Sequence, residues 1–169
     1  GRLLLSLEAV GASEFGSSNN YAESDLKKAV DKWLEDMGKR GLDSAKLIPR
    51  EIDLTTLDGS GCYGKLSVKA APLTLDEARE YADIIPNAER WCWLATGWSG
   101  PSKSDGDLAL YVNSNGDWLY DVCSFSCGIR PALKAPSILF EDSEAGLDLS
   151  KIPTDDLLQE IHRRLAEKA

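Results

Sequence analysis

The residues whose types could do chemistry in this chain are its cysteines, its one histidine, and a group of aromatic and polar side chains. Four cysteines allow three disulfide pairings, and their spacing does not choose among them. Cys123 and Cys127 are four positions apart, as in some zinc sites, but no second close pair accompanies them and His162 is distant in sequence. We therefore expect buried or partly paired cysteines and no metal site. The cysteines are Cys62, Cys92, Cys123 and Cys127.

Catalysis by the common routes needs a nucleophile with a base, a pair of carboxylates, or a metal cluster at a useful spacing. None of these patterns occurs in the sequence. His162 falls in a predicted terminal helix, where a solvated surface position is the expected role. We therefore predict a protein that is not an enzyme and that uses no cofactor.

A binding site is better supported, because exposed aromatic rings stack on sugars or side chains and amide and carboxylate groups add directional hydrogen bonds. Residues 98–120 supply both kinds of group. The pair Asn115-Gly116 also fits a plain turn, and strand alternation must point about half of the side chains inward. For Trp98 and Trp118 the core and ligand roles both stay open. The predicted ligand contacts are Trp98, Asn113, Asn115, Asp117, Trp118 and Tyr120.

Three residues are predicted to support the fold. Trp91 and Trp93 share one face of a regular strand, and we assign both to the core. Arg130 lies between apolar neighbours, so its guanidinium should find a carboxylate or backbone carbonyls. The glycine before Ile129, Gly128, suits a close approach of two backbone segments.

The charge balance excludes several partners. The formal net charge is -9, which disfavours binding to nucleic acid or to an anionic membrane surface but is compatible with a basic protein partner. No run reaches the roughly 20 apolar residues that span a bilayer. For a sugar ligand we expect independence of calcium, because no Glu-Pro-Asn cluster is present.

Local patterns predict the elements that position these residues. Residues 2–10 alternate as a strand, and residues 11–20 have the composition of a loop. Ser24 is the predicted N-cap of an amphipathic helix that Gly38 and Gly41 can end. The apolar stripe of this helix includes Trp33, which we assign to the core.

Further along the chain, strands are predicted near residues 48–57 and 65–70. Thr74 and Glu77 have the spacing of a capping box, which opens a second helix that ends before Pro86. Residues 91–133 are rich in short strands separated by tight turns.

The C-terminal part differs in composition. Residues 138–152 form an acidic linker after a domain of residues 1–137, and residues 153–169 predict an amphipathic helix. So short a helix needs a surface on which to dock, either its own domain or a second copy of the chain, and the sequence leaves both open. Its apolar face contains Leu157, Leu158, Ile161 and Leu165.

A series of motifs in one order carries a resemblance. The motifs are Leu3-Leu4-Leu5-Ser6, Ser18-Asn19-Asn20-Tyr21 with Ser24-Asp25-Leu26, Leu73-Thr74-Leu75-Asp76-Glu77-Ala78, Trp91-Cys92-Trp93-Leu94 and Gly128-Ile129-Arg130-Pro131-Ala132-Leu133. Together they resemble an uncharacterised domain family of phages, prophages and gut bacteria that typically closes on Gly-Val-Arg-Pro-Ala-Leu. The resemblance covers about residues 3 to 135.

That family is similar to the C-type-lectin-like fold shared by formylglycine-generating enzymes and the variable proteins of diversity-generating retroelements. The resemblance implies an α+β domain with two helices packed on a twisted, partly irregular antiparallel sheet, and a ligand-binding face between the Trp-rich and closing motifs. The family's Arg-Ser-Pro-Gly is here Ala95-Thr96-Gly97-Trp98, so this face can differ from that of its relatives. The cysteine context does not match that of the formylglycine-generating enzymes.

Three functional hypotheses follow. The first is a phage- or prophage-associated recognition domain that binds a protein or glycan. The second is a structural or adaptor subunit of a virion or tail, and the third is an acidic inhibitor of a basic host or defence protein. The resemblance suggests a virion or bacterial-surface location, while Leu3-Leu4-Leu5 is too short for a signal peptide.

Overall fold

The computed structural model describes residues 1–137, and they form an α+β fold with two α-helices. None of the helices among these residues is long and apolar enough to cross a membrane. Both predicted C-terminal segments, 138–152 and 153–169, and His162 lie outside the described residues. The elements are β1 (Arg2–Leu5), β2 (Gly11–Glu14), α1 (Asp25–Lys39), β3 (Arg50–Asp53), β4 (Lys65–Val68), β5 (Ala70–Ala71), α2 (Leu75–Glu80), β6 (Cys92–Gly97), β7 (Leu108–Val112), β8 (Trp118–Val122), β9 (Ser126–Ile129) and β10 (Ala132–Ala135), with 3-10 turns at Tyr21–Glu23 and Ser44–Lys46.

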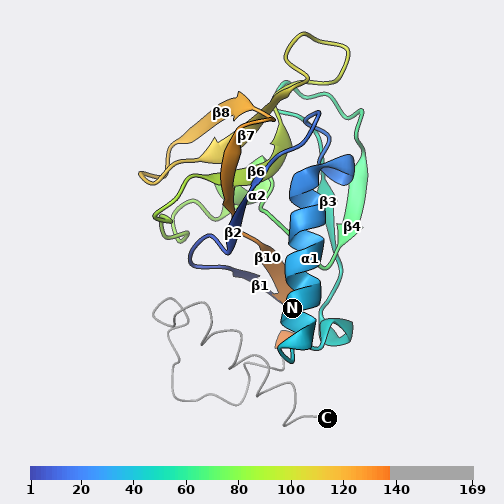
Figure 1. Cartoon of the computed structure of the whole chain (residues 1–169), viewed down its shortest axis with the longest axis vertical. Coiled ribbons are helices and arrows are strands. Elements are labelled where there is room, and N and C mark those ends of the chain that lie inside the picture. The colour runs from blue at the N-terminus through green and yellow to red at the C-terminus, as the bar shows by residue number, and fades with distance from the viewer. Residues whose placement is uncertain (138–169) are drawn as a thin grey trace.

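Helix α1 confirms the prediction from the cap and the apolar stripe. The Ser24 side chain accepts a hydrogen bond from the Lys27 backbone N–H, which satisfies one of the free donors of the first turn. Leu26, Val30 and Met37 are buried along one side of the helix. Figure 1 shows α1 running alongside the sheets, and it contacts β2, β5 and β9.

Helix α2 begins with the predicted capping box. The Thr74 hydroxyl accepts from the Glu77 backbone N–H at 3.2 Å, and the Glu77 carboxylate accepts from the Thr74 N–H at 2.8 Å. Leu75 and Ala78 are buried against β6. The helix is short, so tertiary packing and the cap must supply most of its stability.

The strands form three sheets, of which the largest has the order β2-β9-β6-β7-β8. It is a mixed sheet, because β6 runs parallel to β9 while its other pairs are antiparallel. The prediction of one partly irregular antiparallel sheet is therefore met in part, since most strand pairs are antiparallel but the strands form several sheets. The other sheets have the orders β1-β10-β5 and β3-β4.

Only the first part of the predicted strand over residues 2–10 is a strand, namely β1 at Arg2–Leu5. β1 pairs with β10, and the chain then turns so that β2 pairs with β9. β2 occupies residues predicted as a loop. The ends of β1 and β2 are set by hydrogen bonds with strands more than 100 residues away. The composition of a few consecutive residues cannot indicate partners at that distance.

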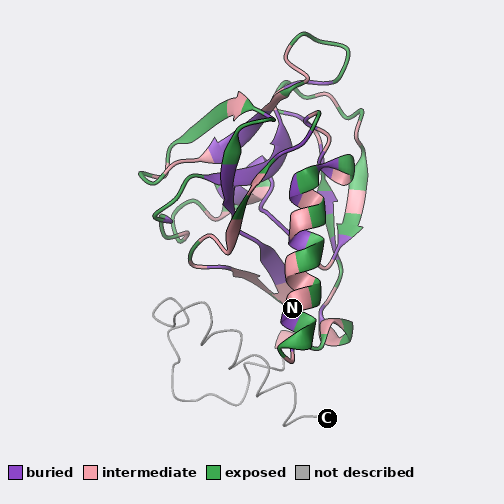
Figure 2. Cartoon of the chain, in the orientation of Figure 1, coloured by how far each residue is buried: buried purple, intermediate pink, exposed green. Residues whose placement is uncertain are grey.

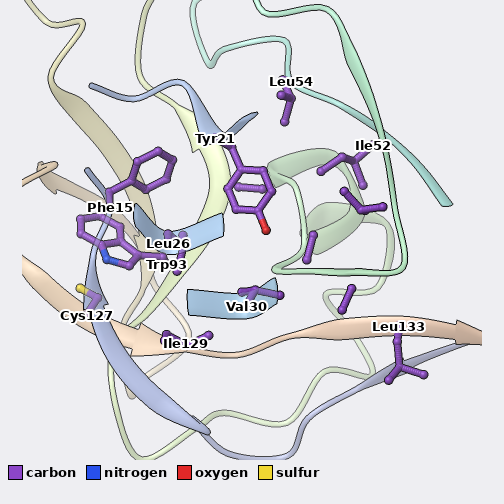
Figure 3. Close-up of a cluster of buried hydrophobic side chains, with 14 of the residues drawn as sticks. Phe15, Tyr21, Leu26, Val30, Ile52, Leu54, Trp93, Cys127, Ile129 and Leu133 are labelled. Carbon is purple, nitrogen blue, oxygen red and sulfur yellow. The ribbon is translucent and has the colours of Figure 1, made fainter. Parts of the chain in front are cut away.

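The core has two parts on opposite faces of β6. Trp93 and Ala95 face α1 and join the larger cluster with Phe15 and Tyr21, whereas Leu94 faces α2. Figure 3 shows Phe15, Tyr21 and Trp93 among the side chains of the larger cluster. Trp33 is partly buried and packs against this cluster, consistent with its assignment to the core.

Candidate recognition surface

The β7–β8 hairpin carries most of the predicted ligand contacts, and its turn is held by Asn113. The Asn113 side-chain oxygen accepts from the backbone N–H groups of Asn115 and Asp117, both at 2.9 Å, and its amide donates to the Asp117 carboxylate at 3.1 Å. Gly116 has φ of +87°, a conformation that favours glycine. Asn113 and Asp117 thus use their polar groups within the turn, and only the Asn115 side chain is left without an intramolecular hydrogen bond among residues 1–137.

Three of the six predicted ligand residues come together on one face of β8. Trp118 and Tyr120 are two positions apart in the strand and therefore point to the same side. Trp98 follows β6 and packs on Tyr120, with ring centroids 4.1 Å apart and the rings tilted by 49°. Trp118 is 41% exposed and Tyr120 51% exposed, while Trp98 is partly buried. We call Trp98, Trp118 and Tyr120 the aromatic face.

An arginine of α2 lies beside the aromatic face. The Arg79 guanidinium lies over the Trp118 ring, 5.8 Å from its centroid. A cation in this position is attracted to the face of the ring, and Arg79 also forms an ion pair with Asp76 at 3.4 Å. Arg79 was missed by sequence reasoning, because only the packing of α2 beside the sheet brings it next to β8.

The opposite side of β8 carries Asp121 and an apolar residue, Leu119. Leu119 is 41% exposed and lies opposite Tyr111 of β7, and the Tyr111 ring stacks with Trp91 at 5.2 Å. Phe125 is 38% exposed, with its ring 6.3 Å from that of Trp91. Trp91 is itself 43% exposed and precedes β6, so its assignment to the core is wrong.

Strand β8 is also the last strand of its sheet. It pairs with β7 alone among residues 1–137, and its residues are mostly exposed, as Figure 2 shows. An exposed edge strand presents backbone donors and acceptors to which another chain can pair. The sequence contains a signal for an exposed apolar strand. Apolar or aromatic residues occur on both faces of β8, which is unusual for a strand with one face toward solvent. They are Trp118, Tyr120 and Val122 on one face and Leu119 on the other.

The cysteines have no arrangement suited to catalysis or metal binding. Cys62, which is exposed, and the three buried cysteines are all free, and no group of three potential metal ligands occurs within residues 1–137. Burial raises the pKa of Cys123 and of Cys127 to about 12 and that of Cys92 to about 11. The three buried thiols are therefore protonated at neutral pH and are poor nucleophiles.

Arg130 is buried, as its proposed structural role requires. Its Nε donates to the Ser6 carbonyl at 2.8 Å and its Nη2 to the Pro86 carbonyl at 2.9 Å. The first bond holds the end of β1, and the second holds the segment after α2. Gly128, two positions before Arg130, lies against the backbone of Trp91. A Cβ added to Gly128 would be 2.8 Å from the Trp91 carbonyl oxygen, so the predicted close approach of two backbone segments is confirmed.

Replacing Arg130 by leucine should lower the free energy of unfolding by about 2 kcal/mol, because two carbonyls lose their charged donor in a buried place. The corresponding fall in Tm is about 4–8 °C. Thermal and urea denaturation would measure it, with Arg90→Leu at an exposed position as the control. An Arg130→Leu protein as stable as the Arg90→Leu control would contradict the structural role.

No protein-family model, curated protein or solved structure matches the chain.

Proposed function

We propose that the chain is a non-enzymatic recognition domain of C-type-lectin-like fold, associated with a phage or prophage, which binds a protein or glycan ligand through the aromatic face. The observation that carries this proposal is the gathering of Trp98, Trp118 and Tyr120 on one exposed side of an edge strand. Large aromatic side chains on a protein surface are typical of binding hot spots. Folding alone would favour burying them.

The edge position of β8 makes a protein the better of the two ligand classes. An extended segment could pair with the free side of β8 while its side chains contact the aromatic face. A glycan would use the ring faces but not the backbone groups of the strand. Asn115 could add a polar contact in either case, whereas Asn113 and Asp117 serve the turn.

A structural or adaptor subunit of a virion or tail is the second candidate. The apolar residues on both sides of β8, Leu119 and Phe125 on one and Val122 on the other, favour it. Permanent subunit interfaces are larger and more hydrophobic than reversible ones, which suits apolar residues on both sides of the strand. This candidate predicts a loss of assembly when Leu119 becomes lysine.

The test starts from selection of ligands with the intact chain, using a glycan array and a displayed peptide library. Replacing Trp118 and Tyr120 together by alanine should weaken any selected ligand at least about thirtyfold, which corresponds to about 2 kcal/mol. Titration calorimetry would measure the affinity, and thermal denaturation would show an unchanged fold.

Ile84→Ala is a matched control, because Ile84 is 77% exposed and lies outside the aromatic face. If the double variant binds every selected ligand as tightly as the Ile84→Ala protein, the aromatic face is not the binding surface. If no ligand is selected but the chain assembles and Leu119→Lys prevents it, the subunit hypothesis replaces the first.

A further inference from the structure

A cavity lies between the segment that follows α2 and the β6–β7–β8 part of the large sheet. Its volume is about 100 Å³, and it is partly open to solvent. Its apolar walls include Leu73 and Leu94, both buried, and Val112. Trp118 and the exposed Asn87 also line it, and Arg130 is the one residue of its lining that carries a charge.

Arg130 brings an unbalanced charge to this cavity. The residue is only 8% exposed, yet its two hydrogen bonds go to neutral carbonyls and none goes to a carboxylate. A guanidinium has five N–H groups, so three of those of Arg130 have no protein acceptor among residues 1–137. Buried charges in proteins are normally paired, because removing an isolated charge from water is costly.

Arg50 is the other buried arginine among residues 1–137, and it has a carboxylate partner. Arg50 is 6% exposed and also donates to two carbonyls, those of Ala71 and Pro72, at 2.8 and 2.9 Å. Unlike Arg130, it forms an ion pair with the carboxylate of Glu77, although its Nε is buried without an acceptor among the described residues. Arg130 has the same carbonyl contacts without the carboxylate.

The neighbours of Arg130 do not supply the missing negative charge by direct contact. Burial raises the pKa of the Cys92 thiol to about 11, so this thiol is neutral at physiological pH. The Glu8 carboxylate is exposed and accepts from the Glu89 backbone N–H at 2.8 Å. Burial accordingly lowers the pKa of Arg130, with Cys92 and Glu8 acting in the opposite direction, but an arginine stays charged at neutral pH.

We propose that this cavity binds a small organic carboxylate, whose oxygens accept hydrogen bonds from Arg130 and whose apolar body lies against Leu73, Leu94 and Val112. A planar guanidinium with free N–H groups matches a carboxylate in shape and charge. The cavity has room for about three water-sized groups, which suits the carboxylate and the first carbons of a short chain. A longer chain extends past Trp118 to the opening.

This site goes beyond the recognition function and does not depend on it. Trp118 borders both the cavity and the aromatic face, but Tyr120 and Trp98 do not line the cavity. Tyr120→Ala should therefore weaken a ligand of the aromatic face and leave carboxylate binding unchanged. The two proposals can fail separately.

The direct test titrates the intact chain with butyrate and with butyramide, which has the same shape without the charge. Two-dimensional NMR in a buffer free of carboxylates and phosphate, at about 150 mM NaCl to screen surface charges, would follow the Trp118 indole and Arg130 Nε–H signals. We expect a dissociation constant for butyrate in the millimolar range and at least tenfold weaker binding of butyramide. Equal affinities of the two compounds, or no binding of butyrate up to 100 mM, would overturn the proposal.

A cavity-blocking variant keeps the proposal testable if Arg130 variants do not fold. Ala82 is exposed at the edge of the cavity, so Ala82→Phe should close the opening, leave the Arg130 hydrogen bonds in place and reduce butyrate binding at least tenfold. Asp83→Phe adds the same ring at the next exposed position, which does not line the cavity, and should leave binding unchanged. Butyrate binding that survives Ala82→Phe, or that Asp83→Phe reduces equally, would place the ligand elsewhere.

Discussion

Replacing Trp93 by alanine is expected to lower the free energy of unfolding by about 4 kcal/mol, the largest effect of any substitution considered. The Trp93 side chain is 1% exposed and contacts the rings of Phe15 and Tyr111 edge-on, at 5.5 and 6.1 Å. Its indole N–H donates to the Ser13 carbonyl of β2 at 3.0 Å. Alanine would leave a large cavity and a carbonyl without its donor.

Trp91→Ala is the matched control, two positions earlier. Trp91 is 43% exposed and its ring contacts those of Tyr111 and Phe125, so its removal should cost about 1 kcal/mol or less. Urea denaturation of both variants, followed by circular dichroism, would give the two free energies. Equal losses for Trp91 and Trp93 would show that both rings are core residues, against the burial described above.

Replacing Glu77 by alanine should lower the free energy of unfolding by about 3 kcal/mol, because it leaves the buried Arg50 guanidinium without its counter-charge. The same carboxylate also accepts from the Thr74 N–H and so completes the cap of α2. One side chain therefore links β3, which contains Arg50, to the start of α2.

Two further variants distinguish the contribution of the Arg50–Glu77 ion pair to stability from that of the α2 cap. Glu80→Ala removes an exposed carboxylate at the other end of α2 and should change stability by about 0.5 kcal/mol or less. The double variant Arg50→Met, Glu77→Leu removes both charges together and should be more stable than Glu77→Ala alone, because no buried charge is left unpaired. A double variant no more stable than Glu77→Ala would mean that the loss comes from the cap.

The helices could be predicted from the sequence because their signals are local. The Ser24 cap and the apolar stripe define α1, and the reciprocal bonds of Thr74 and Glu77 define the start of α2. Each signal depends on residues three or four positions apart, the spacing of neighbours on one face of a helix and of its hydrogen bonds.

The strand arrangement was harder to predict, because a strand's partners are distant in sequence. Residues 2–10 have one continuous pattern, yet β1 ends at Leu5, and β2 begins only at Gly11 and pairs in a different sheet. The parallel contact of β6 with β9 likewise brings Cys92 beside Gly128 without any local sign. Which residues of β8 are exposed depends on its position at the edge of the sheet.

By itself, the sequence determined the residue types of the candidate sites, the capped helices and the need of Arg130 for backbone or carboxylate partners. Tertiary structure alone decided that Trp93 is buried and Trp91 exposed, that Asn113 and Asp117 bond within their turn, and that Trp98 meets Tyr120. It also decided that Glu77 pairs with Arg50, while Arg130 faces a cavity with no carboxylate partner. The physical reason is that burial and charge pairing depend on all the elements around a side chain, whereas caps and turns depend on a few neighbouring residues.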